Sequence, residues 1–277
     1  MVNVNGLEYS MAKRIQQQID SKIRPLLQKK DKDFVLVVDG AEGSGKSTLG
    51  FQIGAYVDPT LNLERVCFTA EQFRNAIMKA QKGQCVIFDE AFVGLSSRGS
   101  LSEINRMLVS LMMQMRQKNL FVIIILPTVF MLEKYVALHR ANVLFHVYEK
   151  RGTRGFYMIF NRKKIKILYL LGKKLYNYNV VKSGFTCRFA SKFPLGDDAE
   201  IEYRKKKLAA LETREEKEKD KFGLVKDKLI ALLQKQTGLS GRKMAELLKN
   251  NDIPVGRGAI RGSLARIEDT GSELALG

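Results

Sequence analysis

One stretch of the sequence restricts the possible folds more than any other. Residues 35–39 form an apolar run, Val-Leu-Val-Val-Asp, and a glycine-rich loop with the spacing G-x-x-x-x-G-K-S follows at once. Such a loop curls its backbone N–H groups around phosphate oxygens when a strand precedes it and a helix follows it. Residues 48–56 have the composition of that helix. The sequence therefore predicts a strand, a phosphate-binding loop and a helix in succession, with the helix ending near residue 57.

The loop and the start of the helix are predicted to hold a nucleoside triphosphate and its metal ion. Glycines let the backbone approach the phosphates, Lys46 places a cation against them, and the Ser47 hydroxyl can ligate Mg²⁺. The positive end of the helix dipole lies at the same place. The residues predicted to bind ATP are Gly40, Glu42, Gly43, Ser44, Gly45, Lys46, Ser47 and Thr48.

A second apolar run, residues 85–88, ends in two carboxylates, Asp89 and Glu90. We expect Asp89 to hold Mg²⁺ together with Ser47, and Glu90 to orient and polarise the attacking water. Lys46 and Glu90 are therefore predicted catalytic residues. The alternative is an ordinary strand end with acidic residues at its tip. The adjacent pair resembles the P-loop ATPases with an additional catalytic glutamate, a group that includes AAA+ proteins, helicases and DNA-pumping motors.

The rest of the first half alternates between strand and helix patterns. Further strands are expected at 65–68 and 121–125, and two capping boxes, at residues 69–72 and 100–103, are expected to open helices. Strands separated by helices predict an α/β fold with a parallel sheet covered by helices, and a ligand at the carboxyl ends of the strands. We assign residues 1–32 to an N-terminal helix, covering about 7–30, and residues 33–150 to a P-loop ATPase core.

Residues 151–199 are predicted to be a basic β-hairpin extension of this core. Short β-type runs at 143–148, 156–160 and 165–170 are separated by basic, turn-like breaks. Cations close to Tyr and Phe suit contact with nucleic acid, where they meet phosphates and stack on bases. The alternative is an edge hairpin kept soluble by its lysines. The candidate DNA-binding residues here are Arg151, Arg154, Arg162, Lys163 and Lys164.

The C-terminal part is predicted to be helical throughout. Residues 200–222 have the charge pattern of a solvated helical linker. Residues 223–277 are predicted to form a small all-α domain. Its helices are expected at 224–236, from Ser240 to 249, and at 257–267, with Arg257 and Arg261 on the outer face of the last one. This arrangement resembles a helix-turn-helix DNA-binding domain. A three-helix protein dock is the alternative.

Composition indicates which kind of partner the protein binds and in which cellular compartment it is expected. The net charge is +18, and residues 141–200 alone hold 12 Lys or Arg against 4 Asp or Glu, which favours an anionic polymer such as DNA as the partner. The three cysteines form no disulfide framework and no metal spacing, so a cytoplasmic location is expected, the host cytoplasm if the protein is viral. The longest apolar run, residues 121–132, is too short for membrane insertion.

A looser resemblance covers residues 33–150. Residues 115–128, with an arginine before the fourth strand, and the segments 132–134 and 139–142 resemble HerA/FtsK-type and Zot-like ATPases. The resemblance implies a ring of copies in which Arg116 or Arg140 reaches a neighbouring γ-phosphate, and a sensor at Thr128. Those families usually carry Gln or Asn at the sensor, so Thr128 departs from their pattern. The same layout of ATPase and basic tail resembles proteins of phages, archaeal viruses and plasmids.

The expected function is a Mg²⁺-dependent ATPase that acts on DNA as an oligomeric translocase or remodelling motor of a virus or mobile element. Genome packaging, transfer or replication would be its setting. The alternative is an ATP-switched DNA-binding factor in replication initiation, partition or transcription, without motor activity. A small-molecule kinase is disfavoured by Glu90, by the basic tail and by the lack of an Arg-rich lid.

Overall fold

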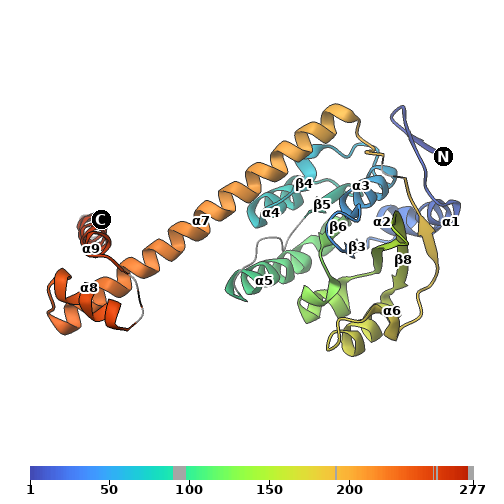
Figure 1. Cartoon of the computed structure of the whole chain (residues 1–277). Coiled ribbons are helices and arrows are strands. Elements are labelled where there is room, and N and C mark those ends of the chain that lie inside the picture. Colours follow the sequence, from blue (N-terminus) through green and yellow to red (C-terminus); the bar gives the residue numbers. More distant parts are fainter. Residues whose placement is uncertain (90–97, 191, 252, 254, 274–277) are drawn as a thin grey trace. The chain divides into compact units, whose positions relative to one another are not determined.

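The computed structural model describes residues 1–89, 98–190, 192–251, 253 and 255–273. The chain folds into two compact units, residues 1–210 and 211–277. The first unit contains all the strands of the described chain and most of its helices, whereas the second is helical (Figure 1).

A seven-stranded sheet is the centre of the first unit. Its strand order is β4-β5-β6-β3-β7-β8-β9. Strands β3 to β7 run parallel, and β8 and β9 add in antiparallel fashion. The bounds are β3 (Phe34–Gly40), β4 (Val66–Cys67), β5 (Cys85–Phe88), β6 (Phe121–Leu126), β7 (Val143–Lys150), β8 (Thr153–Asn161) and β9 (Thr186–Arg188). We call the edge where the parallel strands end the carboxyl edge, and the edge where they begin the amino edge.

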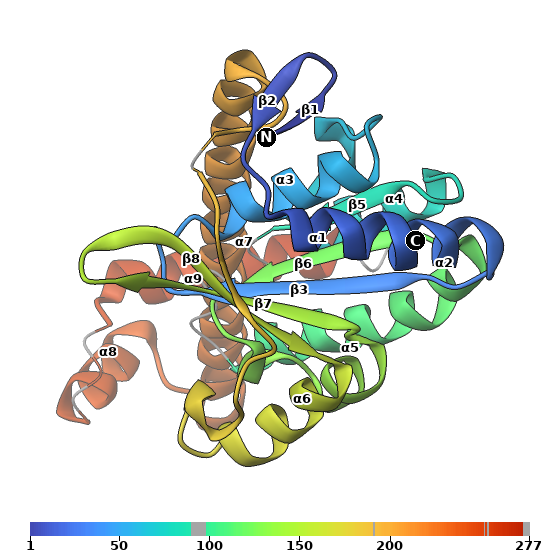
Figure 2. The same ribbon diagram turned by 90° about the vertical axis from the view of Figure 1, so that its right-hand side faces the viewer.

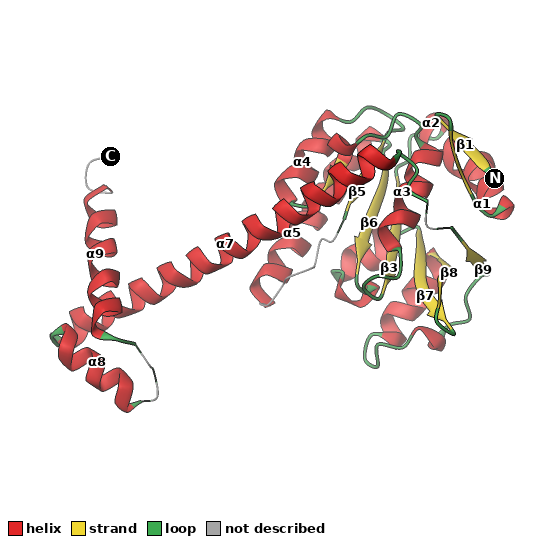
Figure 3. Ribbon diagram, turned by 45° about the horizontal axis from the view of Figure 1, so that its top comes forward, coloured by secondary structure: helices red, strands yellow, loops and turns green. Residues whose placement is uncertain are grey.

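Helices cover both faces of this sheet (Figures 2 and 3). They are α1 (Lys13–Gln18), α2 (Arg24–Lys29), α3 (Lys46–Val57), α4 (Ala70–Lys79), α5 (Arg98–Gln114) and α6 (Arg162–Ile167). Because side chains alternate along a strand, Val35 and Val37 of β3 pack with α4, α5 and α6. Leu36 and Val38 pack on the opposite face with α1, α2 and α3. The α/β fold with a mostly parallel, helix-covered sheet is confirmed.

The local signals in the core were read correctly with one exception. The predicted strands and α3 are present, and Thr69 and Gln72 form the capping box at the start of α4: Gln72 N donates to Thr69 Oγ1 at 3.2 Å, and Thr69 N donates to Gln72 Oε1 at 3.3 Å. Helix α5, however, already begins at Arg98. Ser100 therefore lies inside the helix, and the prediction that it caps the start was wrong.

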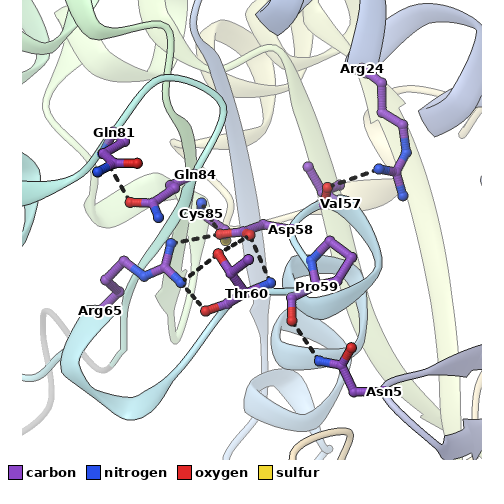
Figure 4. Close-up of polar contacts among 10 residues, drawn as sticks. All are labelled: Asn5, Arg24, Val57, Asp58, Pro59, Thr60, Arg65, Gln81, Gln84 and Cys85. Atoms are coloured by element: carbon purple, nitrogen blue, oxygen red, sulfur yellow. Dashed lines mark hydrogen bonds and ion pairs between the residues drawn. The ribbon is translucent and has the colours of Figure 1, made fainter.

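The end of α3 is fixed by a buried polar cluster (Figure 4). Asp58 follows the helix, and its Oδ2 accepts from Arg65 Nη1 at 2.7 Å and from the Cys85 backbone N at 2.8 Å. Its Oδ1 accepts from the backbone N and the hydroxyl of Thr60, at 2.9 and 2.7 Å. One carboxylate thus joins the end of α3 to the start of β5.

The N-terminal segment differs from the helix predicted over residues 7–30. Strands β1 (Val2–Val4) and β2 (Leu7–Tyr9) form a hairpin before α1. Asn5 and Gly6 at its turn both have left-handed backbones, with φ of 51° and 82°. Asn-Gly is the preferred sequence for such a turn, and this signal was missed. A π-helical turn, Ile19–Ile23, then joins α1 to α2.

The third β-type run of the basic extension, residues 165–170, is also helical. Helix α6 is capped by the Asn161 side chain, which accepts from Lys164 N at 3.1 Å, and continues as a π-helical turn, η6 (Leu168–Gly172). Ile165, Leu168 and Tyr169 are buried at helical spacing, so the period of 3.6 residues prevails over the short alternation. The additional strand comes instead from β9.

Helix α7 (Asp197–Thr237) covers both the predicted linker and the first predicted helix of the C-terminal domain. In the second unit, α8 (Gly241–Asn250) and α9 (Arg257–Glu273) pack with the end of α7 around Ile230, Met244 and Ile260. Arg257 and Arg261 are exposed. Among the described residues, no helix combines the length and apolar character needed to cross a bilayer.

Candidate nucleoside-triphosphate site

The loop between β3 and α3 has a backbone that only glycine tolerates at two positions. Gly40 has a φ of 144°, and a Cβ there would lie 2.1 Å from the carbonyl oxygen of Val147 on β7. Gly45 has a φ of 93°, and a Cβ would lie 3.0 Å from the ring of Phe189. Gly43 is also left-handed, with a φ of 71°, but faces open space. The loop therefore turns sharply at the carboxyl edge, directly before the first residue of α3.

The side chains of the loop indicate that it binds an anionic ligand. Lys46 is largely buried, and its Nζ folds back to donate to the Ala41 carbonyl oxygen at 2.7 Å. The Ser44 hydroxyl is buried and has no hydrogen-bond partner among the described atoms. A buried hydroxyl without a partner is uncommon, and a phosphate oxygen in the loop would satisfy it. The remaining predicted ligands are exposed or partly buried: Glu42, Gly43, Ser47 and Thr48.

The two predicted motifs meet at the carboxyl edge. Asp89 directly follows β5 and is fully buried, and its Oδ1 accepts from Ser47 Oγ at 3.2 Å. A hydroxyl and a carboxylate are the hard oxygen ligands that Mg²⁺ takes together with phosphate oxygens and water, so the pair fits this ion. No cluster of three His, Cys, Asp or Glu side chains occurs in the part of the chain that the structure describes. Glu90 lies outside the described residues.

Tyr203 of α7 completes the surroundings of Asp89. Its hydroxyl donates to Asp89 Oδ2, and its ring packs against Phe51 of α3 and Phe193, at centroid distances of 5.0 and 5.6 Å. Tyr203 lies in the segment predicted to be a solvated linker, and no role in the site is predicted for it from the sequence. The sequence contains only a weak sign that this helix has a buried face: Ala199, Tyr203 and Ala210 recur near helical spacing within a strongly charged segment.

A second buried network adjoins the loop on the other side of β3. Asp39, the penultimate residue of β3, accepts from Val129 N at 2.7 Å, from His146 Nδ1 at 2.8 Å and from the Tyr178 hydroxyl. Tyr178 also lies 2.8 Å from Thr128 Oγ1 and stacks on His146 at 3.7 Å. Burial, followed by the charge of Asp39, raises the pKa of Tyr178, so its hydroxyl stays protonated.

This network fixes the predicted sensor, Thr128. Strand β6 lies between β3 and β5, so the loop that follows β6 lies between the phosphate-binding loop and Asp89 at the carboxyl edge. Thr128 is therefore near the predicted position, but its hydroxyl already contacts Tyr178 and caps the next turn at Phe130 N, 3.4 Å away. Asp39, His146 and Tyr178 were not predicted, because no motif links residues so far apart in sequence.

The structure does not bring Arg140 to this site. Its guanidinium donates to Asp33, which precedes β3 at the amino edge, and the arginine side chain is only 13% exposed. An arginine that reaches a neighbouring subunit needs a free guanidinium at the surface, whereas this one is held in a partly buried ion pair. The side chain of Arg116 lies outside the part that the structure describes.

The predicted DNA-binding residues of the extension separate into two clusters. Arg151 and Arg154 are exposed near the turn between β7 and β8, at the carboxyl edge. Arg162, Lys163 and Lys164 instead form the first turn of α6, which follows β8 at the amino edge. Arg162 donates to the carbonyl of His139. The second turn-like break, residues 161–164, begins a helix, so the strand predicted at 165–170 is absent and the hairpin that it would close does not form.

The extension also forms part of the wall of the site. Gln52 of α3 donates from Nε2 to the carbonyl oxygens of Ala190 and Lys192, at 2.7 and 2.8 Å. Phe193 packs on Phe51 of the same helix, with ring centroids 4.7 Å apart. Together with the Phe189 ring beside Gly45, these contacts attach the segment after β9 to the loop and to α3.

Comparison with known proteins adds little. No protein-family model and no curated protein matches the chain. Among solved structures, the N-terminal domain of zonular occludens toxin from Neisseria meningitidis is similar over 47% of this chain and 84% of that one, with 13% sequence identity and a TM-score of 0.31.

Proposed function

We propose that this protein is a Mg²⁺-dependent ATPase that acts on DNA. The observation that carries the proposal is the meeting of Ser47 and Asp89, 3.2 Å apart, beside a loop whose turns require glycine. The parallel sheet brings the ends of β3 and β5 to one edge, and there the two motifs place a hydroxyl and a buried carboxylate together, the ligand pair that Mg²⁺ takes beside a phosphate-binding loop.

Each residue then has a definite task. The loop N–H groups, Ser44 and Lys46 would bind the phosphates, and the Lys46 ammonium would exchange the Ala41 carbonyl for phosphate oxygens. Ser47 and Asp89 would hold Mg²⁺, which neutralises charge on the β- and γ-phosphates. Glu90 would orient and polarise the attacking water.

The DNA partner is supported by charge. Residues 150–196 contain 12 Lys or Arg and no Asp or Glu, and Arg151 and Arg154 lie at the same edge of the sheet as the phosphate-binding loop. Cations there would neutralise backbone phosphates. A homo-oligomer, such as a ring, and a setting in a virus or mobile element complete the proposal.

One contact favours the second candidate, an ATP-switched DNA-binding factor. Tyr203 links the predicted metal ligand to α7, and α7 continues to Thr237 in the second unit, where Arg257 and Arg261 are exposed. Occupancy of the nucleotide site would then alter the bond between Tyr203 and Asp89 and, through α7, the DNA affinity of the second unit, without any need for movement along DNA.

The test is ATP hydrolysis with and without duplex DNA. We expect Lys46→Ala to abolish nucleotide binding, and Glu90→Gln to retain binding while hydrolysis falls about 10²-fold or more. Lys82→Ala is the matched control, because Lys82 is exposed and pairs with Asp31 just before β3, at the amino edge. Stimulation by DNA supports the motor, and ATP-dependent DNA binding without stimulation supports the switch. Full hydrolysis by Lys46→Ala would refute both.

A further inference from the structure

The segment that follows β8 is apolar on two sides, and only one of them is covered. Ile165, Leu168 and Tyr169 pack into the core, whereas Ile167, Leu170 and Leu171 of the same turns project outward. Leu170 and Leu171 are each 61% exposed, and Leu175 just beyond is 71% exposed. The outer side of these turns exposes large aliphatic side chains to water, which is unfavourable without a partner.

This exposure is concentrated in one place. Of the large hydrophobic side chains that are exposed among the described residues of the first unit, more than half lie between Ile167 and Val180. Four exposed lysines lie on α6 or directly after η6. Lys173 donates to the Tyr169 hydroxyl at 2.6 Å, and the other three, Lys163, Lys166 and Lys174, accompany the exposed apolar side chains. We call the set the apolar–basic face: Ile167, Leu170, Leu171, Leu175 and Tyr176 with Lys163, Lys166 and Lys174.

We propose that the apolar–basic face docks on the surface of an anionic lipid bilayer. A bilayer interface meets both requirements of the face at once: its acyl boundary takes up leucine and isoleucine side chains, and its anionic headgroups attract lysines. Tyr176, with a polar hydroxyl on an aromatic ring, suits the boundary between them. The docking is peripheral, with the core of the protein outside the bilayer.

Charge disfavours the other occupants. A second copy bound through the same face would bring lysines against lysines, and residues 150–196 provide no carboxylate to offset them. Duplex DNA would neutralise the lysines, but its phosphates and stacked bases offer nothing to a cluster of exposed aliphatic side chains. The lipid surface is the partner that uses every member of the face.

The experiment is flotation of the full-length protein with vesicles, after nuclease treatment. Vesicles of phosphatidylcholine with about 30% phosphatidylglycerol are compared with vesicles of phosphatidylcholine alone. We expect binding to the anionic vesicles only, and a loss of at least about tenfold in Leu170→Ser/Leu171→Ser and in Lys163→Glu/Lys166→Glu/Lys174→Glu. Retained ATP binding by each variant shows that the first unit is folded.

Two control variants match these changes elsewhere on the first unit. Met78→Ser/Leu208→Ser removes side chains that are 58% and 59% exposed, and Lys29→Glu/Lys30→Glu/Lys32→Glu makes the same change in net charge at another exposed site. Both are expected to bind vesicles as the wild type does. Equal losses in the controls and in the face variants would refute the proposal, because net charge or surface polarity would then be sufficient.

Three further outcomes would overturn it. No vesicle binding by the wild type would do so directly. Binding that survives Leu170→Ser/Leu171→Ser would reduce the contact to headgroup attraction and remove the apolar docking. If the wild type does not bind vesicles, the double variant shows what the face contacts instead. An oligomer smaller than that of the wild type would assign the face to contacts between copies of the chain, and weaker DNA binding would assign it to DNA.

Discussion

Tyr203 lies in two environments at once. Its ring is enclosed by Phe51, Phe68 and Phe193, and its hydroxyl reaches a carboxylate that is fully buried. The ring accounts for the packing of the first turns of α7 on the sheet unit. The hydroxyl accounts for a specific bond to Asp89, the residue that we expect to hold the metal ion.

Tyr203→Phe separates these two contributions. The ring contacts remain, whereas Asp89 Oδ2 loses its donor, so we expect the free energy of unfolding to fall by about 1–2 kcal/mol in the absence of nucleotide. Urea denaturation measures the change. With ATP and Mg²⁺ present, the deficit is expected to shrink, because a ligand on the same carboxylate replaces the lost bond.

The matched control is Tyr176→Phe, which removes a hydroxyl from an exposed tyrosine. It is expected to leave the unfolding free energy within about 0.5 kcal/mol of the wild type. An equal loss in the two variants would show that the Asp89 contact contributes nothing specific.

Residues of the site were predictable where the chemistry is local. The phosphate-binding loop is one continuous segment, so its glycines, Lys46 and Ser47 can be identified from the sequence motif. Tyr203 is separated from Asp89 by 114 positions, and Tyr178 from Asp39 by 139, so their roles exist only after folding. No pattern of spacing marks such pairs.

At the scale of elements, the buried carboxylate of Asp58 connects the end of α3 to the start of β5. It receives four hydrogen bonds, from Arg65, Thr60 and the Cys85 backbone (Figure 4). Because α3 carries the phosphate-binding loop at one end and Asp58 at the other, the position of the helix depends on both ends.

Asp58→Ala is expected to lower the free energy of unfolding by about 3–5 kcal/mol, since the Arg65 guanidinium would be left buried without its partner. Thermal or urea unfolding measures the loss. The double variant Asp58→Ala/Arg65→Met is expected to recover part of it, because no uncompensated charge then remains. A double variant no better than the single one would contradict the reasoning.

The element errors have a common physical origin. In residues 165–170 the alternation Ile-Lys-Ile favours a strand, but the positions that the sheet face buries, Ile165, Leu168 and Tyr169, follow the helical period. At the N-terminus, the helix predicted from residue 7 covers Leu7–Tyr9, which form strand β2 directly after an Asn-Gly turn. Short apolar runs are ambiguous until the surface that they cover is known.

At the scale of the whole molecule, the second unit is stabilised by a small core and a forked ion pair. Arg266 of α9 donates from Nε and Nη2 to the two carboxylate oxygens of Asp227 of α7, at 2.7 and 2.9 Å. Its hydrogen bond lowers the pKa of Asp227 from 3.8 to about 2. The contribution of the pair is therefore complete above about pH 4 and is lost as the pH falls toward 2.

Asp227→Asn is accordingly expected to destabilise the second unit at pH 7 by about 1 kcal/mol, a small value because the arginine is largely exposed. The difference from the wild type should shrink as the pH falls below 4 and vanish near 2. Calorimetry of the full chain measures it, and Ile260→Ala identifies the transition of this unit. A difference independent of pH would rule out the ion pair as its source.

The ring of Phe189 beside Gly45 has an evolutionary consequence. A related chain could not acquire or discard the segment after β8 as an independent cassette, because the backbone that turns toward the phosphates would lose one of its walls. Recombination just after β8, near residue 161, would yield a core without the Phe189 ring beside its glycine loop. Descendants of this protein are therefore expected to inherit the basic segment and the glycine loop together.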